Sequence, residues 1–92
     1  MIAIEQLAKD FHMKPEDLIK ESIEMFLERK LKSIEAELFL LAKKYGASDV
    51  FEFDKMIKEG RFHEEDTFED YFKFDNLEAD RDLILEHLKK IE

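Results

Sequence analysis

The stretch that decides the fold reads PEDLIKESIEMFLERKLKSIEAELFLLAKKY and covers residues 15–45. It holds no glycine, no proline after Pro15 and no cluster of turn residues, so it predicts a single helix roughly 46 Å long. A compact chain of 92 residues would be only about 32 Å across. We therefore expect the helix either to break, near Arg29 and Lys30, or to extend beyond its own globule and lie against another chain.

This helix carries two apolar patterns in succession. Its first part presents a broad apolar face, which we expect to pack on a preceding helix as a helical hairpin. Its second part has apolar residues spaced alternately by four and three, as in a coiled coil. The members of this heptad seam are Leu27, Leu31, Ile34, Leu38, Leu41 and Tyr45. We predict that the seam forms the interface of a homodimer; the alternative is that it is the core stripe of a bundle within one chain.

Three further helices are expected. The first runs from Ile2 or Ala3 to Phe11, where an apolar stripe repeats at helical spacing. Gly46 ends the long helix, and Ser48 caps a third helix over residues 49–59.

A capping box at residues 66–69 begins a fourth helix, which restarts near Asp75 and reaches about Lys90. No alternating strand pattern is present, so the fold class is all-α. The architecture is a helical hairpin with one long central helix, short helices and a C-terminal helix. Residues 1–92 form a single domain, in which residues 47–92 are an acidic helical tail.

The composition argues against an enzyme. The chain has no cysteine, and none of its three histidines has a second histidine at metal-ligand spacing. There is no phosphate-binding glycine loop and no serine in a nucleophile-elbow context. We therefore predict no catalytic residues, no metal and no cofactor. With no apolar run of 18 residues and no signal peptide, we expect a cytoplasmic protein without a membrane segment. The wealth of Lys and Glu is typical of thermophilic proteins and equally of ordinary charged helical ones.

Charge is distributed unevenly along the chain. Residues 1–46 carry eight basic and nine acidic side chains, whereas residues 47–92 carry seven basic and fifteen acidic ones, a net charge of −8. This acidic half argues against nucleic acid as its partner and favours either a basic protein or simple solubility.

Aromatic residues are concentrated in the same half. Within thirteen residues stand Phe62, Phe68, Tyr71, Phe72 and Phe74. Aromatic rings are enriched at protein interfaces, so the segment is a candidate docking surface for a protein partner. The alternative, which stays open, is that these rings close a small core.

The stretch LAKDFHMKPEDLIKESIEMFLERK, residues 7–30, resembles the two helices of ribbon-helix-helix proteins. That family reads DNA with a paired strand ahead of its first helix, and only residues 1–4 stand there, without basic alternation. The rest of the chain is similar in layout to small prokaryotic antitoxins, which join a dimerising unit to a helical tail that wraps a toxin. The resemblance implies a homodimer whose aromatic segment, with Arg61 and Arg81, binds a toxin such as a small nuclease.

A second hypothesis is a nucleic-acid-binding regulator that uses the N-terminal hairpin. Its contacts would be Lys9, Lys14, Lys20, Arg29, Lys30 and Lys32. That half of the chain is not net positive, which argues against it.

Overall fold

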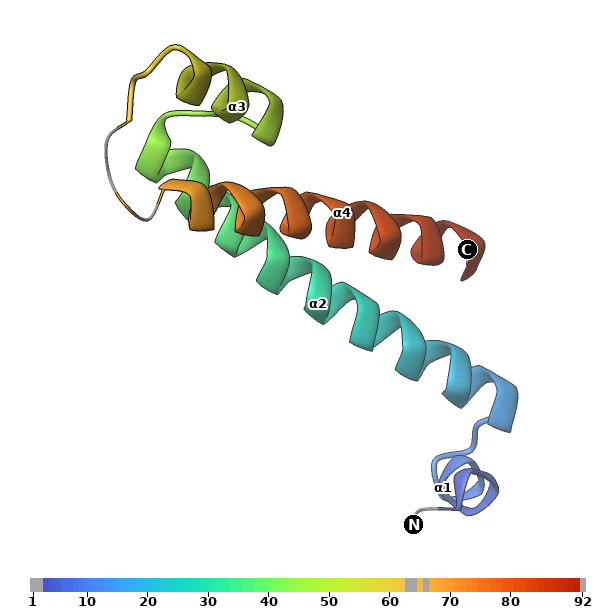
Figure 1. Ribbon diagram of the computed structural model, residues 1–92. Helices are drawn as coiled ribbons and strands as arrows, with labels where there is room; N and C mark the ends of the chain where they lie inside the picture. The colour runs from blue at the N-terminus through green and yellow to red at the C-terminus, as the bar shows by residue number, and fades with distance from the viewer. Residues whose placement is uncertain (1–2, 63–64, 66, 92) are drawn as a thin grey trace.

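The computed structural model describes residues 3–62, 65 and 67–91, and in these residues it has four helices and no strand. They are α1 (Ile4–Asp10), α2 (Pro15–Tyr45), α3 (Val50–Lys58) and α4 (Thr67–Ile91). The prediction of an all-α fold is confirmed. Helices α2 and α4 run antiparallel, α3 lies across one end of the pair, and α1 lies at the other end (Figure 1). The molecule measures 60 × 24 × 17 Å, and its radius of gyration is 19.0 Å, against about 12 Å for a compact chain of this length.

Helix α2 is continuous over 31 residues, so of the two alternatives that the sequence left open, the break near Arg29 and Lys30 does not occur. Pro15 stands in the first turn, where its missing N–H costs no hydrogen bond, and acidic residues follow it at the positive end of the helix dipole. At the other end Gly46 adopts the left-handed conformation, with φ of 68°, and donates its N–H to the carbonyl of Ala42. The start and the end of α2 are thus as the sequence predicts.

The heptad seam of α2 packs within the chain. Leu27, Ile34, Leu38, Leu41 and Tyr45 are 6–9% exposed and belong to one core cluster, with Leu31 packed against it. This cluster also contains Phe53 and Met56 of α3 and Phe74 and Ile84 of α4. The interface that we predicted for a second copy is therefore occupied by α3 and α4 of the same chain. The physical reason is that α4 brings a matching apolar stripe and belongs to the same chain, so its effective concentration at the seam is far higher than that of a second molecule.

The shorter elements correct two local predictions. The side chain of Asp49, not Ser48, caps α3, because its carboxylate accepts a 2.8 Å hydrogen bond from the N–H of Glu52. Ser48 instead donates its hydroxyl to the carboxylate of Glu52 at 2.7 Å. Helix α4 runs through Asp75 without a restart. Of the capping box predicted at the start of α4, Asp66 lies outside the described residues.

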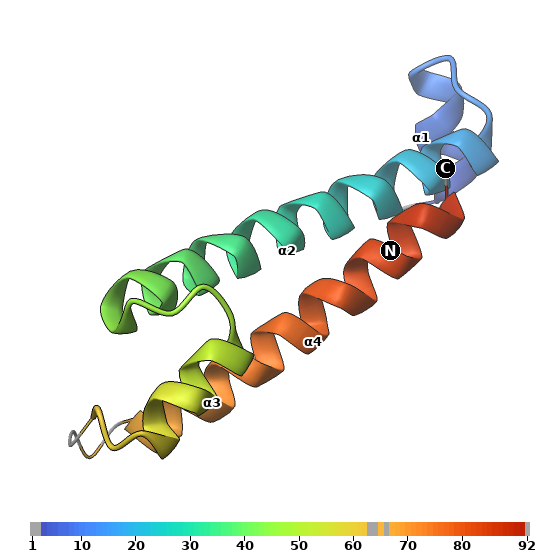
Figure 2. The ribbon, with the colours of Figure 1, turned by 90° about the horizontal axis from the view of Figure 1, so that it is seen from above.

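The two ends of the molecule differ in how well they are packed. At one end, which we call the closed end, α3 packs on the first turns of α4 (Figure 2), and its Phe53 stacks on Tyr45 in the last turn of α2, with ring centroids 4.3 Å apart. Toward the C terminus of α4 the axes of α2 and α4 diverge (Figure 1). Accordingly Leu27 is 9% exposed, whereas Ile23, one turn further toward the N terminus of α2, is 45% exposed. We call this second region, made of α1 and the N-terminal half of α2, the open end.

Candidate interaction surfaces

The aromatic segment predicted to bind a partner is divided by the structure. Phe74 is 1% exposed, and Phe62 and Tyr71 pack against the core. All three surround Phe53, which is fully buried, with ring centroids 5.6 Å from it for Phe62, 5.8 Å for Phe74 and 6.1 Å for Tyr71. These three rings therefore build the core of the closed end, which is the alternative that the sequence left open.

Two rings of the same segment face solvent. Phe68 is 65% exposed and Phe72 is 62% exposed, and they stand four residues apart, hence on one side of α4. Phe72 is held by an edge-on contact with Tyr71, with ring centroids 5.7 Å apart. We call Phe68 and Phe72 the α4 aromatic pair. The exposed carboxylates of Glu69 and Asp75 flank it on the helix surface.

The two arginines assigned to the same surface lie elsewhere. Arg61 is exposed and lines a shallow depression on α3 together with Phe51 and Glu59. Arg81 is partly buried on α4 and donates its Nε–H to the neighbouring Asp82 at 3.2 Å. Nine residues of helix, roughly 13 Å, separate it from Phe72. The structure does not bring either arginine to the aromatic pair.

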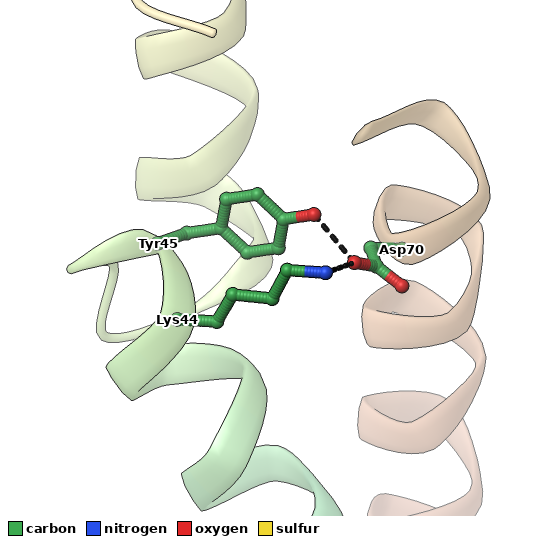
Figure 3. Close-up of polar contacts among 3 residues, drawn as sticks. All are labelled: Lys44, Tyr45 and Asp70. Carbon is green, nitrogen blue, oxygen red and sulfur yellow. Dashed lines mark hydrogen bonds and ion pairs between the residues drawn. The ribbon is translucent and has the colours of Figure 1, made fainter. Parts of the chain in front are cut away.

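A polar cluster joins the end of α2 to the first turns of α4 (Figure 3). Lys44 Nζ lies 2.7 Å from Oδ2 of Asp70, and the hydroxyl of Tyr45 donates a hydrogen bond to the same oxygen. Burial, reinforced by the hydrogen bond to Asp70, raises the pKa of Tyr45 to about 12. Burial opposes ionisation of Asp70, but the hydrogen bonds from Lys44 and Tyr45 outweigh it and lower the pKa of that carboxyl. The cluster stabilises an ionised aspartate and a neutral tyrosine. It thereby holds the last turn of α2 against the first turns of α4 at the closed end.

The open end carries a second apolar surface. The predicted helical hairpin is confirmed, since α1 contacts the first part of α2. An open apolar groove of about 360 Å³ nevertheless remains between the two helices; it is lined by Ile4, Leu7, Leu18, Ile19, Ser22 and Ile23. A second groove of about 210 Å³ follows where α4 leaves α2; it is lined by Phe26, Lys30, Ile34, Asp80, Leu83 and Ile84.

Sequence reasoning expected this broad face of α2 to be covered by the first helix, and missed that it stays exposed. The length of α1 could have indicated this exposure. Seven residues of helix span about 10 Å, whereas the apolar face of α2 from Leu18 to Leu27 spans about 14 Å.

The basic residues considered for nucleic-acid contacts are all exposed, but they do not form one stripe. On α2, Lys20 points about 180° away from Arg29 and about 120° away from Lys32 around the helix axis. Exposed acidic residues, including Glu21 and Glu28, lie between them.

Within residues 3–62, 65 and 67–91, no three acidic or histidine side chains come together as a group that could hold a metal ion. His12 and His87 are exposed, and His63 lies outside the described residues. No helix in the part of the chain that the structure describes is both long and apolar enough to cross a membrane.

The chain matches, over residues 1–92, the model of the family described as "Uncharacterized protein MJ0235 family". It belongs to this family. Neither the curated proteins nor the solved structures contain a significant match to it. The family description names no activity.

Proposed function

We propose that this protein is a non-enzymatic interaction module of the antitoxin type. It binds and neutralises a basic protein partner, such as a small nuclease toxin, through the α4 aromatic pair and the acidic surface around it. The observation that carries the proposal is the exposure of Phe68 and Phe72 beside a core that other rings of the same segment already fill.

The aromatic pair suits a docking role for energetic reasons. Each phenyl ring can bury about 150 Å² or more, and aromatic residues are enriched at the centre of protein interfaces. Because Phe72 already rests edge-on against Tyr71, little side-chain entropy is lost when a partner covers it. A partner with a groove that receives these two rings, spaced by one helical turn, would therefore gain most of its binding energy from the α4 aromatic pair.

The charge of this half of the chain supports a basic partner. The net charge of −8 over residues 47–92 would steer a positively charged protein toward α4 and accelerate the encounter. Nucleases that bind a phosphate backbone are commonly basic for the same electrostatic reason. Since Arg61 and Arg81 stand apart from the pair, the proposal rests on the rings and carboxylates alone.

The test is co-expression with the product of the adjacent gene. Wild-type chain should co-purify with that product and relieve any growth defect that the product causes alone. The double variant Phe68→Ala/Phe72→Ala should lose both properties. Its circular dichroism and free energy of unfolding should stay close to wild type, because exposed side chains contribute little to stability.

Two control variants separate binding from folding. Phe39→Ala removes an equally exposed ring from α2 (61% exposed) and should leave the complex intact. Phe74→Ala removes a buried ring and should lower the free energy of unfolding by about 3–5 kcal/mol. If the Phe68→Ala/Phe72→Ala variant still binds and protects as wild type does, the aromatic pair is not the docking surface.

A further inference from the structure

We infer that the open end is an isologous interface, at which the N-terminal half of α2 pairs antiparallel with the same segment of a second copy. The two-fold axis passes beside Ile23. This pairing is independent of the proposed partner binding, which uses α4 at the closed end. It replaces the heptad seam as the place where two copies meet.

The unpaired chain exposes more surface than a compact protein of its mass. Its accessible surface is 7396 Å². A monomer of 11.1 kDa is expected to expose about 5,650 Å². The excess is about 1,700 Å², and a stable interface of standard size buries only about 800 Å² on each partner. The excess, which belongs to the whole elongated molecule, is thus about twice the area that one partner contributes to a standard interface.

Five residues of α2 form one stripe at the open end, all exposed and all within about 80° around the helix axis. This stripe, the N-terminal face, consists of Glu16, Ile19, Ile23, Phe26 and Lys30. It is the continuation of the heptad seam beyond the point where α4 leaves α2, since Ile23 lies one turn before Leu27. Its apolar members are 43–60% exposed; Ile19 and Ile23 line the groove between α1 and α2, and Phe26 lines the groove where α4 leaves α2.

The charges on this face are self-complementary about Ile23. Glu16 precedes Ile23 by seven residues and Lys30 follows it by seven, so each lies about 10 Å along the helix from Ile23. When two copies of α2 run antiparallel with Ile23 at the axis, Glu16 of each faces Lys30 of the other. A two-fold axis forms every contact twice, so one acidic and one basic residue give two ion pairs.

The apolar positions obey the same symmetry. Ile23 meets its own copy at the axis, and Ile19 of one chain, four residues before the axis, meets Phe26 of the other, three residues after it; all three side chains are exposed in the single chain. A row of apolar contacts bounded at both ends by ion pairs is the arrangement that fixes both register and direction in paired helices. In parallel pairing Glu16 would face Glu16 and Lys30 would face Lys30, which opposes that orientation.

The test is charge reversal followed by sedimentation equilibrium at several protein concentrations and low ionic strength. Wild type should be dimeric at micromolar concentration. Either Glu16→Lys or Lys30→Glu alone places like charges together twice in each dimer. Each single variant should therefore raise the dissociation constant of the dimer at least about tenfold. An equimolar mixture of the two single variants should form a heterodimer, because each pair then unites opposite charges. The double variant Glu16→Lys/Lys30→Glu should likewise recover the homodimer.

Two matched variants control for charge and for helix stability. Asp17→Lys makes the same reversal in the same turn, and Lys32→Glu makes it two residues from Lys30. Both sites lie off the N-terminal face, so both variants should remain dimeric. The Phe68→Ala/Phe72→Ala variant should also remain dimeric, which separates this interface from partner binding. A monomeric wild type, or a mixture of the single variants that fails to associate, would overturn the proposal.

Discussion

Asp70 fastens the closed end by accepting hydrogen bonds from two residues that are adjacent in the sequence. Lys44 is about half exposed, so its ion pair with Asp70 contributes little by itself. Tyr45 is 6% exposed, and its hydroxyl needs a partner because an unpaired buried hydroxyl destabilises the fold. The stabilising part of the cluster is therefore the hydrogen bond between Tyr45 and Asp70.

This cluster predicts how stability depends on pH. The pKa of Asp70 is lower in the folded chain than its usual value of 3.8, so its contribution is present above about pH 4 and is lost as the pH falls through the folded pKa. The pKa of Tyr45 is raised from 10.0 to about 12, so its contribution is present below pH 10 and is lost as the pH rises toward 12.

The substitution Asp70→Asn should lower the free energy of unfolding at pH 7 by about 1–3 kcal/mol. Urea denaturation should also show a weaker loss of stability between pH 5 and pH 3 than in wild type. Asp75→Asn, at an exposed position on the same helix, is the control and should leave both quantities unchanged within about 0.5 kcal/mol. An acid-labile Asp70→Asn variant with wild-type stability at pH 7 would show that the cluster does not fasten the closed end.

The aromatic segment shows what residue patterns can and cannot tell. The high number of aromatic residues in this segment suggested one surface, but helical spacing places these residues on different sides of α4. Phe74 and Tyr71 lie on the side of α4 that faces the core, and Phe68 and Phe72 lie about 100° or more away from Phe74. Counting spacing from the start of the helix would have found this division. Phe62 lies before α4, and only the packing of the loop on Phe53 assigns it to the core.

Among the elements, α2 was predictable because strong local signals mark both of its ends. Pro15 favours the first turn of a helix, and Gly46 favours the left-handed conformation that follows the last turn. The start of α3 was predicted one residue too early, because Ser48 and Asp49 are both good caps and stand side by side. The restart predicted near Asp75 does not occur, and Glu78, three residues further along α4, makes a tertiary contact instead, since its carboxylate accepts the N–H of Val50 at 3.1 Å.

The cap of α3 gives a prediction at the scale of the element. Asp49→Ala should destabilise the chain by about 0.5–2 kcal/mol, because the N–H of Glu52 loses its partner. Ser48→Ala removes a hydroxyl that bonds an exposed carboxylate, so it should cost less. Thermal unfolding followed by circular dichroism measures both. Equal effects of the two substitutions would contradict the assignment of Asp49 as the cap.

For the whole molecule, the sequence identified the seam but not what covers it. A heptad pattern is satisfied equally by a second copy and by another helix of the same chain, since both present the same kind of ridge. Which of the two covers the seam depends on whether the turn at Gly46 and helix α3 direct α4 back along α2. It does so over the C-terminal half of α2 and diverges before the N-terminal half (Figure 1).

An elongated chain with one closed and one open end follows from this divergence. The closed end has a filled aromatic core and presents the α4 aromatic pair to a partner. The open end leaves an apolar stripe bounded by opposite charges. In our account the first surface binds another protein and the second binds another copy, so that one dimer presents two partner sites.

The most direct test of this account is a disulfide at the proposed two-fold axis. The chain has no cysteine, so Ile23→Cys introduces a single thiol, which in an antiparallel dimer meets its own copy within disulfide reach. Under mild oxidation at micromolar concentration, most of the Ile23→Cys variant should migrate as a covalent dimer on a non-reducing gel. Lys32→Cys, on the opposite side of α2, should remain monomeric. An Ile23→Cys variant that stays monomeric, or equal cross-linking of the two variants, would contradict the account.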